Sequence, residues 1–211
     1  MITFIKPAED RIIEYLIRQA DEPFSYREVG ETRQEPPRGF QFDHHRVRLG
    51  QGEDCWRRAC EAIRRWQMFP RTMAEICWPD RPIDEGTIVG VLFRAGPVWA
   101  LSPCRIVYTL DDETPDGREF GFAYGTLPDH VECGEERFAV EWRHADDSVW
   151  YDLSAFSRPA HWLTRVGYPY ARWQQARFRR LSGEAMREAA ANSADDEARL
   201  RLARHATACD A

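Results

Sequence analysis

Residues 119–140, EFGFAYGTLPDHVECGEERFAV, together with the strand-like stretches around them, decide the fold of this chain. Four neighbouring segments are equally rich in β-branched and aromatic residues: TIVGVLFRAG (87–96), VWALSPCRIVYTLDD (98–112), ERFAVEWRHADD (136–147) and SVWYDLSAF (148–156). Short turn sequences with Gly, Pro or Asp separate them. Because parallel neighbours need long crossovers, we expect five or six mostly antiparallel strands.

Two of these segments show how the faces of the sheet differ. In FAVEWR (138–143) apolar and polar residues alternate, which gives one apolar face and one polar face. In GFAYGT (121–126) small residues alternate with Phe122, Tyr124 and Thr126, so one face is almost bare and the other carries rings. A bend in the sheet explains such a bare face, and a wall against a ligand is the alternative.

Helical patterns flank the strands. Residues 7–19 open with proline and two acids and then repeat apolar residues at helical spacing, and residues 53–69 show a second such stripe, which Pro70 ends. Residues 24–30 and 40–49 read as strands. From about residue 160 to 185 the helical period returns, and Pro169 should kink or split that last helix.

These elements predict an α+β fold in which a curved antiparallel sheet wraps around the long C-terminal helix, with additional helices near the N-terminus. One domain should cover residues 1–190, and residues 191–211 should form a polar tail or a short frayed helix. Such a sheet leaves space beneath the helix, and this space would be an elongated cavity.

Composition excludes several classes of protein. The 211 residues carry a net charge of −6, which argues against a nucleic-acid partner. The six cysteines form no CxxC pair, and no signal sequence or transmembrane stretch is visible, so we expect a cytoplasmic protein. Common nucleotide, esterase and zincin motifs are absent, and the adjacent His44 and His45 should face opposite ways, so we expect neither cofactor nor metal.

Several motifs together resemble uncharacterised protein family 0548, a domain of unknown function. They are YREVGET (26–32), PRGF (37–40), LGQGEDCWRRACEAIRRW (49–66), EFGFAYGTLPDHVECGEERFAV (119–140) and AFSRP (155–159). The resemblance covers roughly residues 10–185, and Val131 departs from the proline of the family's HPE. It implies a fold similar to the START-like, birch-allergen-like helix-grip superfamily, which binds apolar ligands between sheet and helix.

The densest group of acid–base residues lies at 130–136. In an extended segment His130 and Glu132 share a face and could act as a general base, with Tyr124 as a further candidate, although a solvated loop is the simpler interpretation. We expect Glu135 or Glu136 to form a structural ion pair with Arg158 instead.

The leading hypothesis is a module that binds a small apolar or amphipathic molecule between sheet and helix. The candidate ligand-binding residues are Phe122, Tyr124, Thr126, Trp142, Trp162, Val166 and Trp173. A cyclase-type or hydrolase-type enzyme that uses His130, Glu132 or Tyr124 is the second hypothesis. An adaptor that uses the arginine-rich last helix is the third. The sequence indicates no oligomeric state.

Overall fold

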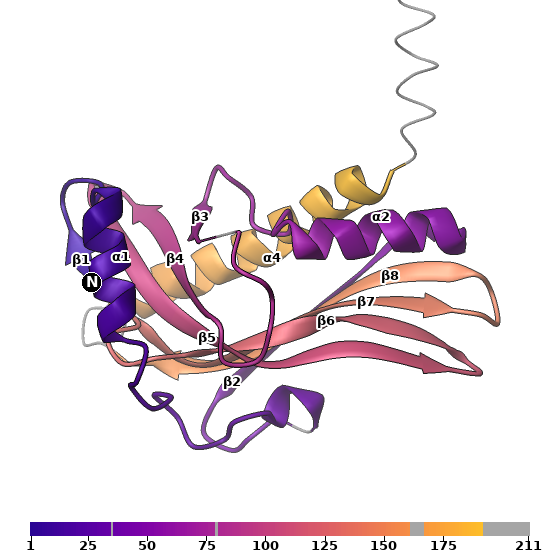
Figure 1. Ribbon diagram of the computed structural model, residues 1–211, viewed down its shortest axis with the longest axis horizontal. Helices are drawn as coiled ribbons and strands as arrows, with labels where there is room; N and C mark the ends of the chain where they lie inside the picture. The colour runs from indigo at the N-terminus through magenta and orange to yellow at the C-terminus, as the bar shows by residue number, and fades with distance from the viewer. Residues whose placement is uncertain (35, 79, 161–166, 192–211) are drawn as a thin grey trace, which may run out of the picture.

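The computed structural model describes residues 1–34, 36–78, 80–160 and 167–191, which form one antiparallel sheet with helices packed on it (Figure 1). The strands are β1 (Ile2–Thr3), β2 (Gln41–Gln51), β3 (Ala74–Cys77), β4 (Ile88–Ala95), β5 (Val98–Thr114), β6 (Gly117–Thr126), β7 (Glu132–Arg143) and β8 (Ser148–Pro159). The helices are α1 (Glu9–Arg18), the single-turn η1 (Glu31–Arg33), α2 (Gly52–Arg64) and α4 (Tyr168–Ala190). In the part of the chain described, no helix is long and apolar enough to cross a membrane.

The strand order confirms the predicted antiparallel sheet. Strands β3 to β8 follow one another across it, β2 pairs with the outer edge of β8, and β1 pairs with the start of β5. All of these pairings are antiparallel. The short turns between the strands allow this order, because an antiparallel neighbour can be reached without a crossover.

The long C-terminal helix lies across the concave side of the sheet, as the sequence predicted. Helix α4 runs along β2 and also contacts β8 and α2, while α2 packs on β7, β8 and β2 (Figure 1). At Gly183 a Cβ atom would come within 2.9 Å of Val47 and 3.0 Å of His45, both on β2. Glycine at this position therefore lets the helix approach the strand closely. The α+β, helix-grip arrangement is confirmed.

Aromatic rings fill the middle of the space between the sheet and these helices. The centroid of Trp66 lies 4.8 Å from that of Phe122, and Phe69 lies 5.4 Å from both Phe138 and Phe178. The expected hollow beneath the last helix is therefore interrupted by side chains. The reason is that the chain after α2 turns inward on the concave side, which the spacing of apolar residues did not reveal.

One local prediction differs from the structure. Residues 24–30 form turns rather than a strand: Ser25 donates its N–H to Thr126, while Tyr26 packs over Gly125. Pro169 lies in the first turn of α4, where its missing N–H has no helical partner to lose. The predicted kink or split of the last helix also involves residues 161–166, which lie outside the described residues.

The second helix is also shorter than expected. It ends at Arg64 rather than near residue 69, because Trp66 adopts a left-handed backbone with φ of 57°. That conformation stops the helix before Pro70 is reached.

Candidate functional site on the concave face

Polar residues of the concave face gather in one line that crosses four strands. Tyr124 of β6 pairs with Glu136 of β7, Glu136 pairs with Ala155 of β8, and Ala155 pairs with Asp43 of β2. Directly paired residues on neighbouring strands project to the same face. We refer to Tyr124, Glu136, Ala155 and Asp43 as the concave row.

Two arginines of α4 cover one end of this row. Arg172 donates to both carboxylate oxygens of Asp43, at 2.5 and 2.6 Å, and an Nη atom of Arg179 lies 3.2 Å from the same carboxylate. The two arginines are seven residues apart, so two helical turns bring them to one side of α4. Their side chains are 25% and 17% exposed. Solvent therefore still reaches both guanidinium groups.

The other end of the row holds a carboxyl group with an altered proton affinity. Tyr124 donates its hydroxyl proton to Glu136 at 2.6 Å. Burial raises the pKa of Glu136 to about 7, although the Tyr124 hydrogen bond and Arg179 act in the opposite direction. Burial and the nearby Glu136 also raise the pKa of Tyr124 well above its usual value. Near neutral pH, Glu136 can therefore both give and accept a proton while Tyr124 stays protonated.

Ala155 leaves the centre of the row open. Neighbouring strands are about 4.8 Å apart, so the backbones at Glu136 and Asp43 are separated by roughly 10 Å with only a methyl group between them. Ala155 is itself partly exposed. Within the row, only the methyl group of Ala155 stands between a protonatable carboxyl group and an arginine-bound carboxylate.

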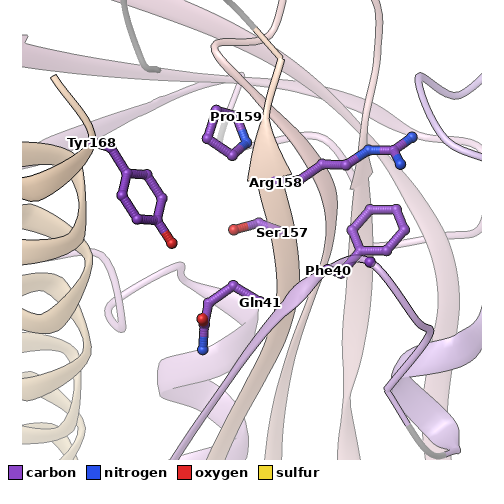
Figure 2. Close-up of a pocket in the computed structure, with 7 residues that line it drawn as sticks. Phe40, Gln41, Ser157, Arg158, Pro159 and Tyr168 are labelled. Atoms are coloured by element: carbon purple, nitrogen blue, oxygen red, sulfur yellow. The ribbon is translucent and has the colours of Figure 1, made fainter. Parts of the chain in front are cut away.

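A cavity of about 440 Å³ lies beside this space, at the start of α4 (Figure 2). Gln41 and Ser157, which line it, pair with each other and stand two residues along their strands from Asp43 and Ala155, on the same face. Figure 2 shows Tyr168 pointing from α4 toward them. The cavity therefore continues the concave row outward.

The predicted pair of His130 and Glu132 side chains does not form. The Nδ1 atom of His130 lies 2.8 Å from the backbone oxygen of Glu132 and 2.9 Å from its backbone nitrogen. Burial lowers the pKa of His130 to about 4, so the ring is neutral at physiological pH. Burial raises the pKa of Glu132 to about 7, while Arg172 acts to lower it. Glu132 therefore lies close enough to Arg172 of the concave site for their charges to interact, whereas His130 contacts the backbone of Glu132.

The predicted ion pair with Arg158 is replaced by other contacts. Glu135 points to the convex face, where the hydroxyl of Tyr26 and groups of residues 30–32 donate hydrogen bonds to it. Glu136 points to the concave face. Arg158 lies over the ring of Phe40, with its Cζ atom 4.5 Å from the centroid. Successive side chains of β7 point to opposite faces of the sheet, so Glu135 and Glu136 meet different partners.

The candidate ligand-binding residues are scattered. Phe122 is fully buried against Trp66, and the hydroxyl of Thr126 is bonded to Gly134. Trp142 stacks on Trp56, far from Tyr124 along the sheet.

Trp173 is 57% exposed on the outer side of α4, against Tyr170. Trp162 and Val166 lie outside the described residues. Among the described members of this set, only Phe122 and Tyr124 adjoin one another beside the site.

The arginines of the last helix do not form one continuous basic face. Arg172 and Arg179 turn inward to Asp43, whereas Arg180 pairs with Glu184 at 2.6 Å. This arrangement does not favour the adaptor hypothesis. Because the arginines recur at an interval of seven, the sequence contained a signal for the inward pair that its analysis missed.

The histidine pair behaves as the strand pattern predicts. His44 contacts Asp152 on the convex face, while His45 lies under Gly183 on the concave face. Within the described ranges, no three His, Cys, Asp or Glu side chains are grouped as metal ligands would be.

Comparison with solved structures finds similar chains. The norcoclaurine synthase of Thalictrum flavum, in complex with dopamine and hydroxybenzaldehyde, is 14% identical with a TM-score of 0.37, over 71% of this chain and 85% of that one. The crystal structure of Ara h 8.0201 is 9% identical with a TM-score of 0.43, over 72% and 98%.

Closer relatives are found by sequence. The UPF0548 protein of Dictyostelium discoideum is 34% identical, over 84% of this chain and 90% of its own length. That of Deinococcus radiodurans is 35% identical, over 77% and 85%. The family model described as a domain of unknown function (DUF1990) matches residues 25–185. The family model covers strands β2 to β8, both arginines and the whole concave row, and the chain therefore belongs to the DUF1990, or UPF0548, family.

Proposed function

We propose that the protein binds a small amphipathic molecule on its concave face. The polar end of this molecule lies over Ala155, between Glu136 and the arginines, and its apolar part extends along the cavity toward Pro159 and Tyr168. The observation that carries the proposal is the carboxyl group of Glu136, which is held at a pKa of about 7 beside the small, partly exposed side chain of Ala155. Perturbed carboxyl groups next to a cavity are typical of functional sites.

The groups around the gap favour an oxygen acceptor on the ligand. Each guanidinium carries five N–H donors. Among the described residues, Asp43 and Gln175 accept hydrogen bonds from Arg172, and Asp43 lies against Arg179, which leaves further N–H groups of the two arginines for a ligand. Protonated Glu136 adds an O–H donor. A carboxylate, sulfonate or carbonyl group would satisfy these donors. The cavity of about 440 Å³ falls in the usual range for small-molecule sites.

Isothermal titration with 1-anilinonaphthalene-8-sulfonate, an amphipathic anion, tests this proposal. Ala155→Leu should fill the gap and weaken binding by at least about tenfold. Ala176→Leu, an equal change at an exposed position of α4, is the matched control and should bind like the parent. Equal binding by both variants would refute the proposed site. Mass spectrometry of organic extracts from purified protein would then identify a natural ligand.

The pH dependence of binding provides a second criterion. Glu132 and Glu136 both have pKa values near 7, because burial disfavours their charged forms. Loss of their protons above pH 7 adds negative charge at the site, so the anion should bind more weakly at pH 8 than at pH 6. Glu136→Gln should flatten this dependence in part. An affinity that does not change with pH in the parent would contradict the placement of the polar end.

The Tyr124–Glu136 pair also supports a second candidate function, an enzyme of the cyclase or hydrolase type. A carboxyl group with a pKa near the working pH is suited to general acid–base catalysis. A panel of p-nitrophenyl esters would test hydrolysis directly. We expect a rate that changes near pH 7 and is lost in Glu136→Gln but kept in Ala176→Leu. A rate that Glu136→Gln leaves intact would exclude this residue as the acid or base.

A further inference from the structure

A second cavity, of about 580 Å³, lies between the chain that follows α2 and the C-terminal half of α4. The rings of Trp66 and Phe69 line it from one side, and Leu181 and Ala185 line it from α4. The concave row lies nearer the start of α4, under Arg172 and Arg179, and the ring centroid of Phe69 is 6.3 Å from that of Tyr124 in this row. The two cavities share no lining residue, and the inference below does not depend on the proposed function.

The walls of this cavity carry opposite charges that do not neutralise each other. Arg65 and Arg71 belong to the wall near α2, and Glu184 and Glu188 belong to the wall formed by α4. Arg65 pairs with Glu61 of its own helix at 2.7 Å, and Glu184 pairs with Arg180 at 2.6 Å.

Arg71 and Glu188 have no ion-pair partner among the residues that the structure describes, and no ion pair there spans the cavity. A molecule with one positive and one negative group can pair with the glutamates of one wall and the arginines of the other.

Trp66 adds an unsatisfied group at the base of this cavity. The residue is 4% exposed, and its indole N–H has no hydrogen-bond partner among the residues that the structure describes. Its backbone is left-handed, with φ of 57°, which is unfavourable for an aromatic residue. Buried donors are normally paired, and strained residues cluster at functional sites.

We infer that this second cavity binds a small zwitterion with an apolar side group, a molecule of the free amino acid class. Its carboxylate lies toward Arg65 and Arg71 and accepts a hydrogen bond from Trp66. Its ammonium group lies toward Glu184 and Glu188. The apolar side group packs on Leu181 and Ala185.

The charge pattern excludes simpler ligands. A plain anion would face the two glutamates, and a plain cation would face the two arginines. A neutral apolar molecule would remove all four charges from water without providing any of them with a partner, which is unfavourable. Only a molecule with both charges satisfies both walls.

Calorimetric titration with L-phenylalanine and L-leucine tests the inference, with 3-phenylpropionate and phenethylamine as analogues that each lack one charge. We expect at least one amino acid to bind, and L-phenylalanine, if bound, to exceed both analogues by about tenfold or more. Quenching or a shift of tryptophan fluorescence on binding should disappear in Trp66→Phe, which keeps an aromatic ring but removes the indole and its N–H. If neither amino acid binds at about 10 mM, or if the analogues bind equally well, the inference is wrong.

Exposed variants keep the test valid even if Trp66→Phe fails to fold. Arg71→Gln and Glu188→Gln should each weaken binding about fivefold or more, because each removes one partner of the zwitterion. Arg57→Gln and Glu53→Gln, exposed positions at the start of α2, are the matched controls and should bind like the parent. If binding is lost in Ala155→Leu but not in Glu188→Gln, the amino acid occupies the concave site and the second cavity is excluded.

Discussion

Glu135 and Glu136 are neighbours on β7, yet their carboxyl groups lie on opposite faces of the sheet and in opposite environments. Glu135 accepts a hydrogen bond from Tyr26 at 2.8 Å and two more, at 2.7 and 3.1 Å, from backbone N–H groups of residues 30–32. Glu136 accepts one, from Tyr124 at 2.6 Å. The carboxyl group of Glu135 is therefore occupied by several donors and anchors the N-terminal segment. The carboxyl group of Glu136 can still accept further hydrogen bonds or exchange a proton.

Glu135→Gln should destabilise the fold. A carboxylate that is 2% exposed accepts several donors here, and an amide would place its own N–H₂ group against some of them. We expect a loss of about 1–3 kcal/mol in the free energy of unfolding, measured by urea denaturation. Glu22→Gln, on the exposed surface, is the control and should change little. An unchanged midpoint in Glu135→Gln would show that the segment does not depend on this anchor.

Gly125→Ala should displace the same segment from the other side. A Cβ atom at Gly125 would lie 2.0 Å from the hydroxyl oxygen of Tyr26, which is too close for any contact. We expect a loss of roughly 2–4 kcal/mol, measured by thermal and urea unfolding. In a Tyr26→Ala background the shortest contact is gone, although the ring of Phe24 would still lie 3.0 Å from the Cβ atom, so the same glycine substitution should cost much less. Equal losses in both backgrounds would contradict the steric explanation.

Glu136 should make stability depend on pH. In the native protein its pKa is about 7, whereas in the unfolded chain it is near the ordinary value of 4.5. Between these values the native state binds more protons, so stability falls as pH rises and the penalty is complete above pH 7. Glu136→Gln should therefore gain stability relative to the parent, on the order of 1–3 kcal/mol more at pH 8 than at pH 4.5. Urea titrations at both pH values measure this, and a constant difference would refute the raised pKa.

A buried hydrogen bond fastens α4 to the sheet. The hydroxyl oxygens of Tyr151 and Ser182 are 2.8 Å apart, and both residues are fully buried. Tyr151→Phe leaves the serine hydroxyl without this partner and should lower stability by about 1–2 kcal/mol. Adding Ser182→Ala should recover part of that loss, and a double-mutant cycle measures the coupling. Additive losses would show that the two hydroxyls do not interact.

The strands could be predicted because their signals are local. Alternation in 138–143 and the short turns between segments specify antiparallel neighbours with one apolar face, and β6, β7 and β8 follow that pattern. Residues 24–30 carry a similar alternation but form turns, since Phe24 and Tyr26 pack onto the sheet instead of joining its ladder. Periodicity reports which side chains are buried, not which backbone groups pair.

The site was only partly predictable. Tyr124 was correctly placed on the face that carries rings, but its partner is Glu136, not His130 or Glu132. Asp43 was not among the predicted site residues. Its actual partners, Arg172 and Arg179, lie more than a hundred residues away in sequence.

The sequence by itself determined the fold class, the family and which face of each strand carries rings, because these follow from neighbouring residues and from shared motifs. Tertiary structure decided which groups meet. Strand order brings β2 beside β8, and Gly183 lets α4 settle on β2, so that Asp43, Glu136 and the two arginines surround one gap. The inward turn at Trp66 likewise fills the middle of the hollow and leaves a cavity on its outer side. Such encounters depend on packing over the whole chain, which no local pattern encodes.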